Sequence, residues 1–85
     1  MLNFEKLIEF DGRASTVPIA INPVNVISIS PVKRHLKEVN GQKVENLSLV
    51  EIHYSLGSEV KKVFVVGEYN KLINKIQNKR NILHG

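Results

Sequence analysis

The sequence predicts a small α+β domain, an antiparallel β-meander of about five strands with one C-terminal helix packed on the sheet. Two observations on turns and one on spacing support this prediction. Asn40-Gly41 and Gly57-Ser58 are two-residue hairpin signals, because asparagine and glycine tolerate the positive φ values of tight turns. The registers imposed by the two turns agree on one apolar face. From Tyr69 onward the apolar spacing changes from strand-like to helical.

The two turns predict which strand residues face each other. Folding at Asn40-Gly41 gives these pairs: Val39 with Gln42, Pro31 with Val50, Ile29 with Ile52, and Ile27 with Tyr54. Folding at Gly57-Ser58 gives two more: Ile52 with Val63, and Val50 with Val65. A slip of one residue at either turn would move the apolar side chains to the opposite face, so the agreement of the two turns supports both.

The N-terminal region is expected to form the first two strands. The first covers residues 4–10, with a short helical turn over residues 2–7 as the competing interpretation. Asp11-Gly12 then makes a turn, and residues 16–21 return antiparallel to the first strand. Pro18 has no N–H for a ladder, so the second strand should lie at an edge or begin there. Asn22-Pro23 interrupts the pattern, and a third strand should start near Val26.

Residues 33–46 are much more polar than their neighbours, and we call them the basic arm. Strand pairing either continues to the Asn40-Gly41 tip, which gives an arm projecting past the core, or is replaced by a frayed loop. Residues 47–54 and 60–66 are expected as the fourth and fifth strands. The fifth strand is apolar on both faces, so Leu49 and Phe64 on the second face either contact a second copy or lie under the N-terminal strands.

The C-terminal helix is expected to follow Gly67 as its N-cap, with Glu68 in the first turn. Its apolar residues form a narrow stripe: Tyr69, Leu72, Ile73, Ile76 and Leu83. A lysine stripe lies beside it, at Lys71, Lys75 and Lys79. The predicted core of the whole domain combines strand and helix positions: Phe10, Ile27, Ile29, Val50, Ile52, Val63, Val65, Leu72, Ile73 and Ile76.

Length and composition narrow the classes of protein. The 85 residues are expected to form one domain, 1–85, with a limited core, and a hydrophobic content of 42% argues against disorder. The chain has no cysteine, which excludes disulfides and thiolate metal sites and fits the cytoplasmic location we expect. Charged residues near the start argue against a signal peptide, and no stretch approaches the roughly 20 apolar residues of a membrane helix.

The net charge of +4 is unevenly distributed. Residues 1–59 carry six Lys/Arg and seven Asp/Glu, whereas residues 60–85 carry six Lys/Arg and one acid. Candidate contacts to nucleic acid or to an acidic partner lie on the basic arm and the helix: Lys33, Arg34, Lys37, Lys43, Lys71, Lys75 and Lys79. A solvated helix face is the alternative. An RNA-binding sheet needs exposed aromatic side chains, and the core is expected to use most of the few present.

Few residues are suited to catalysis. The histidines at 35, 53 and 84 lack metal-ligand spacing, so we expect no metal and no other cofactor. Ser30, Glu51 and His53 are the nearest approach to a nucleophilic triad. Alternation places Glu51 and His53 on one face, but nothing marks Ser30 as an activated nucleophile. No glycine-rich phosphate loop is present, and we expect a protein that is not an enzyme.

Three segments stand in an order that resembles a known family. They are a strand and turn at residues 8–12, an INP-x-x-I-x-x-I-like run at residues 19–29, and a strand entering a helix at residues 63–73. This order is similar to a family of short proteins that includes the flagellar protein FlbD and many phage proteins. The basic arm is longer here than in the FlbD pattern, which favours the phage members. The resemblance implies a small non-catalytic accessory protein that acts by binding, and it supplies no functional residue.

The expected function is therefore a non-enzymatic interaction module of the phage-accessory type. It would bind a protein partner and associate with itself through Leu49 and Phe64. Two other functions stay open. One is a nucleic-acid binder that uses the basic arm and the helix lysines. The other is a sponge that holds a nucleotide or another small anion at a subunit interface.

Overall fold

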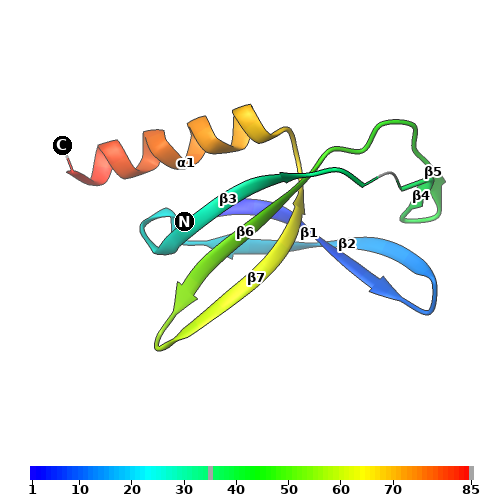
Figure 1. Cartoon of the computed structure of the whole chain (residues 1–85), viewed down its shortest axis with the longest axis horizontal. Helices are drawn as coiled ribbons and strands as arrows, with labels where there is room; N and C mark the ends of the chain where they lie inside the picture. Colours follow the sequence, from blue (N-terminus) through cyan, green and yellow to red (C-terminus); the bar gives the residue numbers. More distant parts are fainter. Residues whose placement is uncertain (35, 85) are drawn as a thin grey trace.

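A computed structural model of the chain describes residues 1–34 and 36–84, with side chains described as far as residue 79. It contains a five-stranded antiparallel sheet, a separate two-stranded ladder and a C-terminal helix (Figure 1). The elements are β1 (Leu2–Phe10), β2 (Arg13–Ile21), η1 (Pro23–Asn25), β3 (Val26–Val32), β4 (Glu38–Val39), β5 (Gln42–Lys43), β6 (Leu49–Leu56), β7 (Glu59–Val66) and α1 (Tyr69–His84). The predicted α+β class is confirmed.

The five strands of the main sheet lie in the order β2-β1-β7-β6-β3. The last strand, β7, pairs with both β6 and β1, and so joins the N-terminal hairpin to the rest of the sheet. The consecutive strands β2 and β3 therefore lie at opposite edges, and η1 connects them. The edge position expected for the strand with Pro18 is confirmed. The helical alternative for residues 2–7 is wrong, because β1 begins at Leu2.

The turns at Asp11-Gly12 and Asn40-Gly41 both have the backbone conformation of a tight hairpin. The φ values are 53° and 75° at Asp11 and Gly12, and 55° and 75° at Asn40 and Gly41. Positive φ at both central residues is the requirement of a type I′ turn. The predicted pairs are confirmed in five cases: Val39 with Gln42, Ile29 with Ile52, Pro31 with Val50, Ile52 with Val63, and Val50 with Val65.

The predicted pairing of Ile27 with Tyr54 is wrong. The register between β3 and β6 shifts between Val26 and Ser28, so Val26 takes the position opposite Tyr54. The extra residue of such a bulge is left out of the regular alternation. Ile27 is accordingly 58% exposed, and Val26 replaces it in the core.

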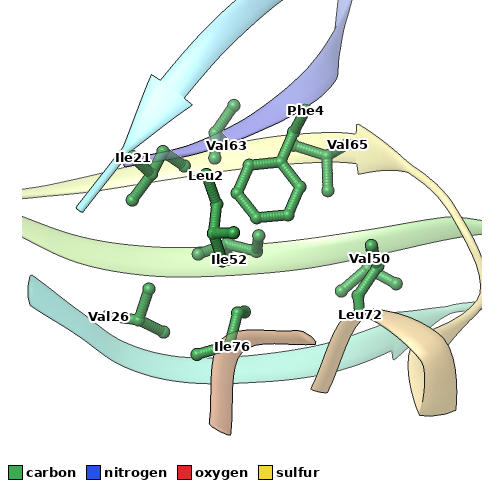
Figure 2. Packing of buried hydrophobic residues seen from close by; sticks show 10 residues of the cluster. All are labelled: Leu2, Phe4, Ile21, Val26, Val50, Ile52, Val63, Val65, Leu72 and Ile76. Atoms are coloured by element: carbon green, nitrogen blue, oxygen red, sulfur yellow. The ribbon is translucent and has the colours of Figure 1, made fainter. Parts of the chain in front are cut away.

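The main core lies between α1 and one face of the sheet, which we call the helix face. Figure 2 shows its ten buried side chains, contributed by every strand of the main sheet and by the helix. They are Leu2, Phe4, Ile21, Val26, Val50, Ile52, Val63, Val65, Leu72 and Ile76. The sequence prediction missed the contributions of the N-terminal hairpin, Leu2, Phe4 and Ile21. These side chains join the core because β1 pairs with β7, which brings the hairpin beside the middle strands.

Three further positions differ from the predicted core. Phe10 is 81% exposed, because it ends β1 at the tip of the N-terminal hairpin, away from the main core. Ile29 and Ile73 are half-buried instead of buried. The side chain of Leu83 lies outside the residues whose side chains are described.

The basic arm neither projects freely nor continues the long ladder of β3 and β6. Its only described pairing is the short β4-β5 ladder, which turns back to contact β2. Asn40 holds it there: its backbone N–H donates to the Ala14 carbonyl oxygen at 3.0 Å. Its side-chain oxygen accepts from the Thr16 N–H at 2.9 Å, and its amide donates to Thr16 Oγ1 at 2.9 Å. Asn40 thus occupies hydrogen-bonding groups on the open edge of β2.

The second face of the sheet, which we call the arm face, is buried near the arm. Leu7, Val39 and Leu49 are buried but lie outside the core cluster under the helix. Alternation along β1 and β6 places Leu7 and Leu49 on the arm face. Arg34 of the arm also pairs with Glu9 of β1. We infer that the arm, held at Glu9 and at β2, covers this part of the arm face.

The helix begins one residue later than expected. The Leu72 N–H donates to the Glu68 carbonyl oxygen at 3.0 Å, so Glu68 occupies the N-cap position and Gly67 precedes it. Gly67 has φ of 151° and lies directly against Leu72. The chain needs glycine at this junction because it turns there from β7 onto the helix face.

Candidate functional site

The helix lysines lie on the side of α1 that faces β1. Lys75 Nζ is 5.6 Å from the centre of the Phe4 ring, and Phe4 is a buried residue of β1. Lys71 and Lys79 lie four residues before and after Lys75, so they share its side of the helix. All three side chains are exposed. The predicted lysine stripe therefore forms one exposed row at the boundary between helix and sheet.

Strand alternation places Lys6 on the same side of the sheet as these lysines. Lys6 is opposite Val65 and Val17, whose side chains share the helix face with Phe4. Alternation points Glu5 and Glu9 of the same strand to the arm face. On the helix itself, the nearest acid is Glu68, whose Oε2 is 3.8 Å from Lys71 Nζ. The sheet thus separates the charges of β1, with the lysine on the helix side and the glutamates on the other.

The four cations of the basic arm are arranged differently. Arg34 donates a hydrogen bond from Nη2 to Glu9 Oε2, which lowers the pKa of Glu9 and raises the pKa of Arg34. Lys43 lies opposite Glu38 in the β4-β5 ladder, and Lys37 is exposed beside that ladder. Two of these four cations are therefore placed beside acidic residues, whereas in the helix row only Lys71 has an acid, Glu68, within ion-pair distance.

The base of the arm adjoins the start of the helix. Lys33, Arg34, Glu68 and Tyr69 line a surface hollow of about 440 Å³. Figure 1 shows α1 and the arm leaving the middle of the molecule in opposite directions. Of the predicted basic residues, only Lys33 and Arg34 line this hollow, and none of the helix lysines does. The two predicted basic groups therefore do not form one continuous surface.

The predicted self-association residues lie on the arm face, and one of them is inaccessible. Leu49 is only 2% exposed, so it offers no surface to a second copy of the folded chain. Phe64 is half-buried, with Lys62 Nζ 5.7 Å from its ring centre. The sequence placed Leu49 on the second face correctly. Of the two alternatives that the sequence left open, contact with a second copy or burial within the chain, the second holds for Leu49.

Ser30, Glu51 and His53 do meet on the arm face, but in an order unsuited to a triad. His53 Nε2 and Glu51 Oε2 are 2.9 Å apart and form a hydrogen bond between half-buried side chains. The strand register places Ser30 opposite Glu51, and Ser28 opposite His53. The serine considered as a nucleophile therefore neighbours the carboxylate, whereas a triad needs it beside the imidazole.

The described residues hold no group of three or more His, Asp or Glu side chains arranged to bind a metal ion. Of the three histidines, His35 and the side chain of His84 lie outside the described part. Within that part, no helix combines the length and the apolar character needed to cross a membrane.

A second surface feature was not expected from the sequence. A cleft of about 720 Å³ lies between the tips of the β1-β2 hairpin and the arm, and its lining includes Phe10, Arg13, Glu38 and Asn40. Phe10 and Arg13 are direct neighbours in the β1-β2 register. One feature of the sequence could have indicated that Phe10 is exposed. Phe10 immediately precedes the turn at Asp11-Gly12, and side chains at a hairpin tip often lack a covering layer.

Comparisons with known proteins identify no relative. No family model matches the chain, and no match was found among the curated proteins or the solved structures. The resemblance to FlbD-like and phage proteins stays a prediction.

Proposed function

We propose that this chain is a non-enzymatic binding module that recognises an acidic segment of a protein partner through Lys6, Lys71, Lys75 and Lys79. The observation that carries the proposal is the separation of charge by the sheet. Four cations lie on the helix side, while Glu5 and Glu9 point away from them. A surface with such an excess of cations, with Glu68 beside Lys71 as its nearby acid, attracts an oppositely charged partner and accelerates encounter with it.

The spacing of the lysine row fits an extended acidic peptide. Residues four apart on a helix are separated by about 6 Å along its axis. Alternate side chains of an extended chain are about 6.6 Å apart and point to the same side. A peptide with an acid at every second residue can thus present its carboxylates in step with Lys71, Lys75 and Lys79. Surface charge pairs are individually weak, so the row would act as a set.

A second candidate function is binding of single-stranded nucleic acid. The hollow lined by Lys33 and Tyr69 favours it, because its lining combines a cation with an aromatic side chain, the two groups that bind phosphates and stack on bases. Phosphate binding would use Lys33 together with the helix lysines and would depend steeply on salt. The proposal also includes a phage-type accessory role, which the family resemblance supports. It includes a cytoplasmic location as well, which the lack of cysteine supports.

The test compares two triple variants with equal loss of charge. In one, Lys71, Lys75 and Lys79 become glutamine; in the other, Lys33, Lys37 and Lys43 do. Fluorescence anisotropy measures binding of a labelled peptide with glutamate at every second position, and of an oligothymidylate of equal charge. Circular dichroism establishes that both variants are folded.

We expect the helix variant to lose at least about tenfold in affinity for the peptide, and the arm variant to lose much less. Equal losses, or no peptide binding by the wild type, would contradict the acidic-partner proposal. Tighter binding of the oligothymidylate, with a steep salt slope and sensitivity to the arm variant, would favour the nucleic-acid alternative.

A further inference from the structure

The two hairpin tips that border the cleft are attached to each other by defined contacts. Asn40 makes three hydrogen bonds to Ala14 and Thr16, which fix the arm tip against the edge of β2. Phe10 and Arg13 belong to one wall, and Glu38 belongs to the other. The cleft has about 720 Å³ of space, which is ample for an inserted aromatic side chain.

Phe10 stands at this cleft with 81% of its surface exposed. A phenylalanine is one of the largest apolar side chains, and exposure of this degree leaves most of its hydrophobic surface in water. It is also the most exposed of the large apolar residues in the described part of the chain. An exposed aromatic beside an open cleft is typical of an anchor at an interface.

The charges at the cleft restrict what can occupy it. Arg13 and Glu38 both line it, and neither takes part in the four ion pairs found among the described residues. A uniformly acidic partner would place negative charge against Glu38, and a nucleic acid would do the same with its phosphates. A partner that carries both an anion and a cation can satisfy both groups.

We propose that the cleft binds a second copy of this chain. The same surface presents an exposed ring, a cation and an anion, and is therefore complementary to itself about a two-fold axis. In this dimer, Phe10 of each copy enters the cleft of the other. Arg13 of each copy pairs with Glu38 of the opposite copy, and both contacts form twice.

This interface lies apart from the lysine row and goes beyond the acidic-partner function. The proposed dimer uses a different surface from the one predicted from the sequence, which contained Leu49 and Phe64. Because the two sites share no residue, each can be removed without the other. The triple helix variant should still dimerise, and a monomeric tip variant should still bind the glutamate peptide.

The first test measures mass in solution by sedimentation equilibrium over a wide range of protein concentration. We expect a concentration-dependent dimer for the wild type, and a dissociation constant raised at least about 30-fold by Phe10→Ser. Phe10 is exposed, so this change should not disturb folding. Val60→Ser removes another exposed apolar side chain, on β7, and serves as the matched control.

The second test uses charge reversal in separate copies. Arg13→Glu leaves two acids at each cleft, and Glu38→Arg leaves two cations, so each variant alone should be monomeric. Mixed together, the two variants should form a heterodimer, because both contacts then join opposite charges. Complementation between copies can arise only if the two residues meet across an interface.

Three results would overturn the proposal. The wild type could stay monomeric at every concentration. Phe10→Ser could dissociate the dimer no more than Val60→Ser does. The mixed charge variants could fail to associate while circular dichroism shows both to be folded.

Discussion

Replacing Gly67 with alanine should strongly destabilise the protein, for two reasons that the structure separates. The first is the backbone: φ is 151° at this position, a region that residues with a Cβ rarely adopt. Holding a non-glycine residue in such a region costs about 1–3 kcal/mol. The second is space, because Gly67 joins β7 to α1 directly beside the buried Leu72.

A Cβ at position 67 would lie 2.8 Å from Leu72 Cδ1, 3.0 Å from Cγ and 3.2 Å from Cδ2. All three approaches are shorter than ordinary van der Waals contacts, so Leu72 or the start of the helix must move. Overpacking of this kind costs about 1–3 kcal/mol. With the backbone cost, the total is roughly 2–6 kcal/mol. A chain of this size has a stability of only about 4–13 kcal/mol, so the loss is a large fraction.

Gly57→Ala provides the matched control. Gly57 has φ of 62°, but an added Cβ would meet nothing within 4 Å. Gly57→Ala should therefore lower the free energy of unfolding only through the unfavourable backbone conformation, by about 1–2 kcal/mol. Urea denaturation followed by circular dichroism gives both free energies of unfolding.

The packing part of the effect can be measured in a double-mutant cycle with Leu72→Ala. Shortening Leu72 removes the atoms that clash, so the two changes together should cost less than the sum of the single changes. Strict additivity, or equal losses for Gly67→Ala and Gly57→Ala, would show that the close approach to Leu72 has no energetic consequence.

Three other expectations concern the arm and its contacts. Asn40→Gly keeps the turn but removes two side-chain hydrogen bonds, one of which is accepted from the Thr16 N–H. Hydrogen exchange should therefore become faster at the Thr16 amide, whereas Asp11→Gly at the other turn should leave that rate unchanged. Arg34→Gln should raise the Glu9 pKa in a carboxyl NMR titration. Because folding lowers the Glu9 pKa, the ion pair with Arg34 stabilises the protein at pH values above the pKa of the unfolded carboxyl group. This contribution is small and screened by salt, and it is lost as the pH falls through the Glu9 pKa of the folded protein. Leu49→Ala should destabilise the fold by about 2–5 kcal/mol in urea denaturation; an unchanged midpoint would contradict its burial.

The candidate surfaces were predictable to different degrees. The lysine stripe follows from helical spacing alone, and the structure confirms that Lys71, Lys75 and Lys79 share one side. Lys6 could not be assigned to the helix side from the sequence, because that assignment depends on the pairing of β1 with β7 and on which face of the sheet the helix covers. The cleft at the hairpin tips was also out of reach, since it forms where residues 24 positions apart, Thr16 and Asn40, meet.

Local sequence was sufficient to predict the turns, the registers near them and the change to a helix after β7, but not the bulge at Ile27. These are local properties: a positive φ at Asn40-Gly41 and a side-chain period of two are sufficient to align Ile29 with Ile52. Which apolar residues are covered could be seen only once the segments were packed together. Leu49 is buried and Phe10 exposed because the arm returns to β2 and the N-terminal hairpin extends beyond the core. Burial depends on contacts between distant segments, and the local pattern of a strand is the same whether or not another segment covers it.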